Sequence, residues 1–269
     1  LPPTNEAGYV EHEGACIWYA AYGEGEPVIL LHGGLGHSGN WGYQIPALLT
    51  AGCRTIVIDS RGHGRSTRDA RPYSYELMAG DVRAVMDALD VRGAALAGWS
   101  DGACVALILG RIMPERVAGV LFFGCNMDPS GTRELTSPNP VVDRCFARHR
   151  EDYAALSATT GAFESLVAAV SEMHRTQPNY TPSDLADVHV PVLIAHAEHD
   201  EFIRREHAEY LARSIPNATL VLLPDVSHFA PLQRPETFDA LLTGFLRQCF
   251  TSTRSATSGR WSEPRSVQT

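Results

Sequence analysis

The chain of 269 residues has no lysine, so all 22 of its basic residues are arginine, and its formal net charge is −9. The arginines form no basic run, so the chain lacks the positive stripe typical of proteins that bind a phosphate backbone. No apolar stretch reaches the roughly 20 residues that a membrane span needs. We therefore expect a soluble protein that binds neither nucleic acid nor a membrane, and the sequence leaves its oligomeric state open.

Paired cysteine motifs are also missing. The six cysteines lie far apart and none forms a Cys-x-x-Cys pair, so we predict buried free thiols rather than a disulfide framework. The cytoplasm is the default expectation for such a protein. Because the chain begins with Leu1 rather than methionine, a removed signal peptide remains the alternative.

Apolar strand patterns alternate with helical patterns through the first half of the chain. A predicted hairpin at 9–22 comes first, and the apolar runs that follow are typical of strands covered on both faces. These runs lie at 28–31, 54–58, 94–99 and 117–123, with helical patterns between them at 41–51, 74–89 and 101–110. The alternation predicts an α/β fold with a mostly parallel, doubly wound sheet.

The alternation stops at residue 126. Residues 126–185 hold turn-forming sequence and two helical patterns, near 141–156 and 161–174, with no strand pattern. We interpret 126–185 as a small helical cap inserted after the sixth strand, with two ordinary crossover helices as the alternative. The core then comprises 1–125 and 186–250, its second part holding predicted strands at 190–195 and 218–223 and helices at 206–213 and 235–249. The Ser/Thr-rich segment 251–269 is expected to be a flexible tail, in which Trp261 is the one candidate anchor.

One serine lies at the tightest turn of this pattern. Ser100 is flanked by Gly98 and Gly102 in the sequence Gly-Trp-Ser-Asp-Gly, where a predicted strand reverses into a helix beginning at Asp101. Glycine on both sides avoids a collision with the neighbouring backbone. The start of the helix directs free N–H groups and the positive end of a dipole toward the serine, which suits a developing oxyanion.

A serine nucleophile needs a base and an acid that orients the base. His228 is the candidate base because it follows the last predicted strand, whereas His32 is expected to be structural, bonding within the glycine loop after an earlier strand. Asp200 follows the strand at 190–195 and is the candidate acid. Its rivals are Glu198, Glu201 and Asp128.

Two other site types are disfavoured by spacing. The glycine loop His32-Gly-Gly-Leu-Gly36 lacks the Lys-Ser/Thr of a phosphate loop. A metal site would draw on His196, His199, Asp200 and His207, but their spacing matches no compact ligand set. We predict neither a metal nor a cofactor.

Four motifs occur in order: the His32 glycine loop, Asp59-x-Arg-Gly-x-Gly-x-Ser66, the serine turn, and Pro191-Val-Leu-Ile followed by Asp200 and His228. Together they resemble the α/β-hydrolase superfamily over about residues 10–250, in the branch of small, capped serine esterases and lactonases. The resemblance implies Ser100 as nucleophile, His228 as general base and acid, and Asp200 as the orienting carboxylate. It also implies an oxyanion hole made by the backbone N–H groups of Gly34 and Asp101. One departure is Ala197, where the family often has glycine.

The Gly-Trp-Ser-Asp-Gly form resembles the biphenyl-hydrolase-like group, whose members include hydrolases of amino-acid esters. Asp101 then has two interpretations: it complements the helix dipole, or it also favours a cationic acyl group. The apolar residues near the motifs are candidates to line a pocket, although core packing explains each equally well: Trp41, Trp99, Met127, Phe202 and Phe229.

The predicted function is hydrolysis of small carboxylic esters through an acyl-enzyme. The alternatives on the same residues are lactone or C–C bond hydrolysis, acyl transfer and perhydrolysis. A binding protein of the hydrolase fold with vestigial activity is the remaining alternative.

Overall fold

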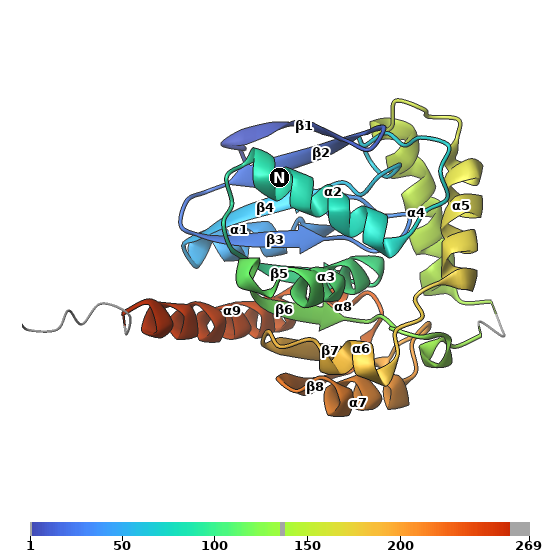
Figure 1. The fold of residues 1–269 in the computed structure, drawn as a ribbon. Helices are drawn as coiled ribbons and strands as arrows, with labels where there is room; N and C mark the ends of the chain where they lie inside the picture. The colour runs from blue at the N-terminus through green and yellow to red at the C-terminus, as the bar shows by residue number, and fades with distance from the viewer. Residues whose placement is uncertain (1, 135–137, 259–269) are drawn as a thin grey trace, which may run out of the picture.

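The computed structural model describes residues 2–134 and 138–258, and an eight-stranded sheet lies at its centre (Figure 1). The strand order is β1-β2-β4-β3-β5-β6-β7-β8, in which β2 is antiparallel to its two neighbours and all later pairs are parallel. The strands are β1 (Glu6–His12), β2 (Ala15–Tyr22), β3 (Glu26–Leu31), β4 (Cys53–Ile58), β5 (Ala94–Trp99), β6 (Val117–Phe123), β7 (Val192–His199) and β8 (Ala218–Ser227). The predicted mostly parallel, doubly wound sheet is confirmed.

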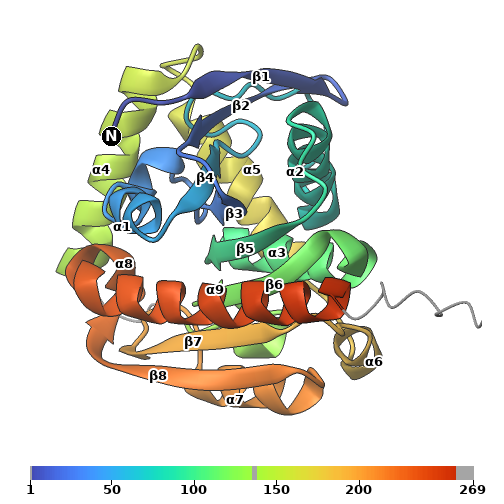
Figure 2. The same ribbon diagram turned by 90° about the vertical axis from the view of Figure 1, so that its left-hand side faces the viewer.

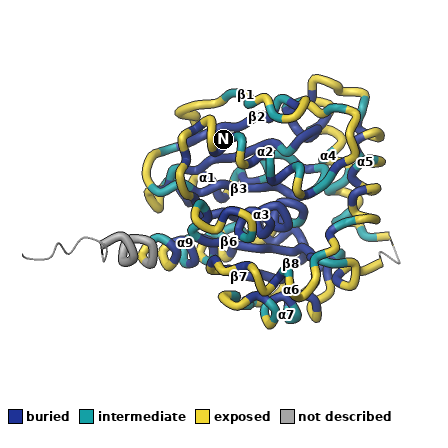
Figure 3. Tube along the Cα trace, in the orientation of Figure 1, coloured by how far each residue is buried: buried dark blue, intermediate teal, exposed yellow. Residues whose placement is uncertain are grey.

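Helices cover both faces of the sheet (Figure 2). One face carries α1 (Gln44–Thr50), α8 (Ala230–Gln233) and α9 (Pro235–Ser258), and the other carries α2 (Tyr75–Ala88), α3 (Asp101–Ile112) and α7 (Arg205–Ser214). Successive side chains of a strand point to opposite faces, so in β3 Val28 and Leu30 pack in the first of these layers while Ile29 and Leu31 pack in the second. The central strands are therefore buried on both sides, as Figure 3 shows.

Two long helices follow β6 and lie across the carboxyl ends of the strands (Figure 1). These helices, α4 (Pro140–Leu156) and α5 (Phe163–Thr176), correspond to the two helical patterns predicted within the cap. The centroid of the Phe163 ring lies 5.5 Å from that of Phe146 and 5.6 Å from that of Tyr153. These ring contacts join α4 to α5. A short helix, α6 (Pro182–Ala186), was not predicted. The position of α4 and α5 puts side chains of these two helices above the ends of the strands.

Several boundaries differ from those predicted. The helix predicted at 41–51 is divided into a 3-10 turn, η1 (Ser38–Trp41), and α1, and β8 continues to Ser227. The closing helix α9 runs to Ser258, so the expectation of a flexible tail from 251 is wrong for 251–258. A helix that is already nucleated adds one hydrogen bond per residue, which favours its extension. Trp261 and the rest of 259–269 lie outside the described residues.

The six cysteines are free thiols, as predicted, and four of them are buried: Cys53, Cys104, Cys125 and Cys249. Cys16 and Cys145 are only half-buried, so the prediction of burial is wrong for these two. Within 2–134 and 138–258, no helix combines the length and apolar character needed to cross a membrane.

Candidate active site

Ser100 occupies a sharp bend between β5 and α3. Its backbone has φ 54° and ψ −125°, a region that side-chain-bearing residues avoid unless the surroundings enforce it. A Cβ at Gly98 would lie 2.2 Å from the Gly102 carbonyl oxygen, and a Cβ at Gly102 would lie 2.1 Å from the Leu31 carbonyl oxygen. Both positions therefore require glycine, and these glycines let the chain turn tightly enough to present the serine hydroxyl.

The backbone also fixes this bend from the neighbouring strand. The Ser100 N–H donates to the Phe123 carbonyl oxygen at the end of β6, over 2.8 Å. Ser100 is thus held at the carboxyl edge of the sheet, beside the strand that leads into the cap.

The candidate base and acid are in direct contact. His228 follows β8, and its Nδ1 lies 3.0 Å and 3.1 Å from the two carboxylate oxygens of Asp200. The same carboxylate accepts the backbone N–H groups of Phe202 and Ile203, each at 2.9 Å. Burial raises the pKa of Asp200, but the His228 ring and these donors outweigh it and hold the pKa below its usual value. The carboxylate is therefore ionised and accepts the Nδ1–H of His228.

The rival carboxylates have other partners. Glu201 accepts the backbone N–H of His228, and Glu198 accepts the backbone N–H of Asp225, each at 3.0 Å. Asp128 caps the 3-10 turn η3 (Pro129–Gly131) by accepting the Ser130 N–H. Within the described part of the chain, Asp200 alone hydrogen-bonds to the His228 ring.

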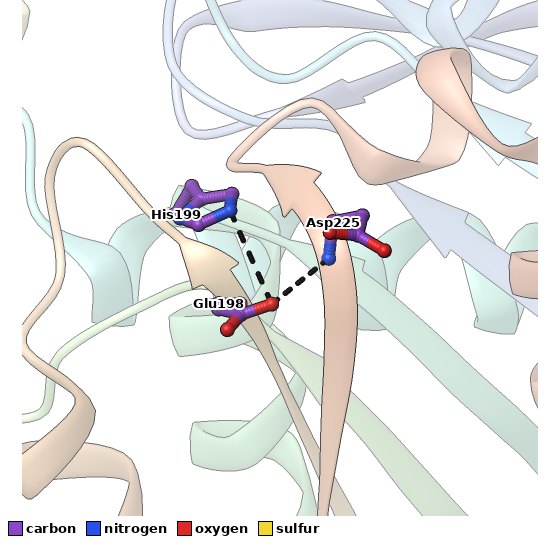
Figure 4. Close-up of side chains that lie close together, drawn as sticks. All are labelled: Glu198, His199 and Asp225. Atoms are coloured by element: carbon purple, nitrogen blue, oxygen red, sulfur yellow. Dashed lines mark hydrogen bonds and ion pairs between the residues drawn. The ribbon is translucent and has the colours of Figure 1, made fainter.

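The histidines and aspartate considered for a metal site do not gather as one ligand set in the described ranges. The one group of potential ligands found there is Glu198, His199 and Asp225, whose ligand atoms lie within 4.8 Å of one another (Figure 4). All three are exposed, and Glu198 is already an acceptor for the Asp225 N–H. We assign this group no function.

His32 ties two loops together, as predicted for a structural residue. Its Nδ1 donates to the Gly33 carbonyl oxygen at 2.7 Å, and its Nε2 accepts the Ser60 N–H at 2.9 Å. Burial lowers the pKa of His32 to about 4, so the ring is neutral and in a single tautomer. It holds the glycine loop beside the serine rather than acting as a base.

The motif at 59–66 supports the same loops. Asp59 is fully buried and accepts the backbone N–H groups of Ser38 and Arg65 at 2.7 Å and 2.9 Å. Arg61 forms a buried, two-bond pair with Asp81 of α2, with N–O distances of 2.7 Å and 2.8 Å. The structure thus gives this motif a scaffolding role.

A cavity of about 470 Å³ lies between the strand ends and the helices α4 and α5. Ser100, His228, Gly34 and Asp101 all line it, together with cap residues of α4 and α5. Of the predicted apolar lining residues, three are in its wall: Trp99, Phe202 and Phe229. Trp41 and Met127 are instead fully buried, each packed in one of the two hydrophobic layers that flank the sheet.

The backbone N–H groups of Gly34 and Asp101 find no acceptor within the described part of the chain. Gly34 also lies against the start of α3, since a Cβ there would be 2.6 Å from an Asp101 carboxylate oxygen. Two free donors thus belong to residues that line the cavity beside Ser100.

The Asp101 side chain has two partners that the sequence did not indicate. Tyr75 Oη donates to Oδ1 at 2.9 Å, and His174 Nε2 lies 2.9 Å from Oδ1 and 3.1 Å from Oδ2. Burial raises the pKa of Asp101, but the His174 and Tyr75 contacts outweigh it and lower the pKa overall. The negative charge of Asp101 in turn raises the pKa of His174. The partners come from α2 and α5, so linear spacing carried no signal of them.

A glycine-bounded serine lies at the edge of a mostly parallel α/β sheet, and it lines the same cavity as the histidine of a buried His–Asp pair. This combination defines a hydrolase architecture. The chain belongs to the alpha/beta hydrolase family, whose family model matches residues 28–241.

Its relatives include hydrolases and non-heme chloroperoxidases. The chain is 28% identical over 249 residues to the serine hydrolase BPHL of Mus musculus, covering 87% of this chain and 84% of that protein. It is 26% identical over 261 residues to a putative non-heme chloroperoxidase of Synechocystis sp., covering 86% and 95% of the two chains. The solved structure "Est816 as an N-Acyl homoserine lactone degrading enzyme" is 31% identical, with a TM-score of 0.68 and coverage of 88% and 99%. The similarity to BPHL agrees with the resemblance seen in the serine turn.

Proposed function

We propose that the protein is a serine hydrolase that cleaves small carboxylic esters through an acyl-enzyme on Ser100. One observation carries the proposal: a serine forced into a strained turn shares its cavity with His228, whose other ring nitrogen is held by Asp200. The cavity thus holds a hydroxyl and a base, and a buried carboxylate orients the base, which are the groups that acyl transfer through a serine requires.

The chemistry follows from the tautomer of His228. Because Nδ1–H donates to Asp200, Nε2 has a free lone pair and takes the proton of Ser100 as Oγ attacks the ester carbonyl carbon. The negative oxygen of the tetrahedral intermediate accepts hydrogen bonds from the free backbone N–H groups of Gly34 and Asp101. The C–O bond then breaks, and the alcohol leaves with the proton from Nε2. In the second half of the reaction, water gives a proton to Nε2 and attacks the acyl carbon, and the bond to Ser100 Oγ breaks as Oγ takes the proton back from Nε2.

No step in this scheme uses a cofactor, and the small ester is the one partner that it requires. The six free thiols fit a reducing compartment such as the cytoplasm.

A fluorophosphonate probe and a panel of p-nitrophenyl esters of increasing acyl length test the proposal. We expect the probe to label Ser100, as located by peptide mass spectrometry, and the protein to hydrolyse the short-chain esters. A Ser100→Ala variant should do neither. Failure of the unmodified protein to label or to turn over any ester would favour a binding protein with the hydrolase fold.

Lactone hydrolysis is the second candidate, because a solved relative at 31% identity is described as degrading N-acyl homoserine lactones. A lactone is a cyclic ester, so the same residues would open it, and the alcohol would remain tethered to the acyl group. Comparing kcat/KM for acyl lactones and for open-chain esters of equal acyl length separates the two. C–C bond hydrolysis, acyl transfer and perhydrolysis are tested by assaying the unmodified protein with substrates and acyl acceptors of those three reactions.

A further inference from the structure

The cap and the serine turn are joined by one polar contact inside the cavity. His174, on the last turn of α5, places Nε2 2.9 Å from Asp101 Oδ1, and Asp101 is the residue that follows Ser100. The Asp101 side chain is 10% exposed and that of His174 is 47% exposed. The contact therefore has a buried anion at one end and a ring open to the cavity mouth at the other.

This pair borders the place where an acyl group would lie. A Cβ built on Gly34 would meet Asp101 Oδ2 at 2.6 Å and His174 Cε1 at 3.5 Å, so both side chains abut the glycine whose N–H faces the oxyanion in the proposed function. Both side chains also line the 470 Å³ cavity.

The carboxylate is already satisfied by protein groups. Oδ1 accepts from Tyr75 and from His174, and Oδ2 lies 3.1 Å from the same His174 nitrogen. The charge of Asp101 raises the pKa of His174, which favours the protonated ring. A substrate ammonium approaching Asp101 would have to displace this ring, and it would meet a like charge.

We propose that His174 is a specificity-determining residue that occupies the cation position on Asp101, so that the acyl site accepts uncharged acyl groups and disfavours those bearing an ammonium. The inference rests on the proposed function, since it assigns the space beside Ser100 to the acyl group. It narrows the substrate class to esters of neutral acyl groups. It also makes Asp101 a partner of the cap rather than the direct recognition group for a cationic substrate.

The test uses binding, so that it does not depend on turnover. In a Ser100→Ala background, calorimetry at pH 6 compares L-phenylalanine benzyl ester, which is cationic, with its uncharged N-acetyl derivative. We expect the parent to bind the neutral ester more tightly. Adding His174→Ala should shift the ratio of the two dissociation constants toward the cationic ester by about tenfold or more, because the ammonium then becomes the partner of Asp101.

Three further proteins make the result specific. His174→Gln keeps a hydrogen-bond donor without charge and should give a smaller shift than His174→Ala. Adding Asp101→Asn to His174→Ala should abolish the shift, since no anion remains. Arg175→Gln removes a positive charge next to His174 on the exposed side of α5, where Arg175 pairs with Glu172, and should leave the ratio at the parent value.

An unchanged ratio in His174→Ala, or tighter binding of the cationic ester by the parent, would overturn the proposal. The proposal would also be overturned if neither ester bound any of these proteins, because the cavity would then not be the acyl site. Labelling of Ser100 by the fluorophosphonate probe is scored separately, so loss of the proposed hydrolase function and loss of this specificity role give different results.

Discussion

His228 Nδ1 and Asp200 Oδ2 lie 3.0 Å apart across the carboxyl ends of β7 and β8, although the two residues are 28 positions apart in sequence. Both side chains are nearly inaccessible to solvent, and the carboxylate holds two backbone donors in addition to the ring. The contact fixes which ring nitrogen is free.

Asp200→Asn tests that relationship directly. An amide can donate to Nδ1 and so favours the wrong tautomer, and we expect kcat to fall by about 10⁴-fold with the fold intact. Glu201→Gln is the matched control, because the one hydrogen bond of the Glu201 side chain within the described residues is accepted from the His228 backbone N–H. Removing the Glu201 charge should lower kcat less than about tenfold. Equal losses in the two variants would remove Asp200 from its proposed role.

Ser100→Ala should lower kcat by about 10⁶-fold, as expected when the nucleophile of such a unit is removed. Ser100→Gly should be equally inactive but more stable than Ser100→Ala by about 1 kcal/mol, because φ 54° suits glycine and strains alanine. Ester kinetics and chemical denaturation measure the two effects. Residual turnover near that of the unmodified protein would place the nucleophile elsewhere.

The glycines around the serine should be intolerant of a methyl group. Gly102→Ala would put a Cβ 2.1 Å from a backbone oxygen of β3, and we expect destabilisation by about 3 kcal/mol or a failure to fold. Gly244→Ala in α9 has no atom within 4 Å of the added Cβ and should stabilise the protein by roughly 0.5–1 kcal/mol. Unfolding in urea measures both effects: relative to the unmodified protein, the midpoint should fall for Gly102→Ala and rise for Gly244→Ala. Equal shifts in the two variants would contradict the steric argument.

His32 should make folding stability depend on pH. Its pKa in the folded protein is about 4, below the ordinary 6.5, so between these values the unfolded chain binds more protons. The contribution of His32, at most about 3 kcal/mol, is complete above pH 6.5 and is lost as the pH falls toward 4.

Denaturant titrations at several pH values measure this dependence. His32→Gln should reduce the slope of unfolding free energy against pH in that window by about one proton equivalent. Two other histidines have pKa values lowered to about 4 by burial, namely His63, which is buried, and His149, which is half-buried, and they should preserve part of the slope. His199→Gln, at an exposed position, should leave the slope as it is. A slope unaffected by His32→Gln would contradict the assignment of a neutral ring.

Local rules made much of this protein predictable. The alternation of apolar strands with helical patterns specifies a doubly wound sheet because each strand must be buried on both faces, and Gly98 and Gly102 specify the serine bend because nothing larger fits. The structural role of His32 was predicted from its position directly before the glycine loop. Each of these inferences depends on residues close together in the chain.

Contacts between distant segments had to come from the tertiary structure. Four carboxylates were candidates to orient His228, and only packing of β7 against β8 brought Asp200 to the ring in place of Glu198, Glu201 or Asp128. Packing likewise put Trp99 in the cavity wall and Trp41 in the core. His174 lies 73 positions from Asp101, and no periodicity links them. The sequence by itself determined the sheet and the serine turn, because strand burial and backbone sterics are local. Only the tertiary structure determined which side chain contacts Asp101. The position of α5 over the strand ends depends on the packing of many helices that are distant in the chain.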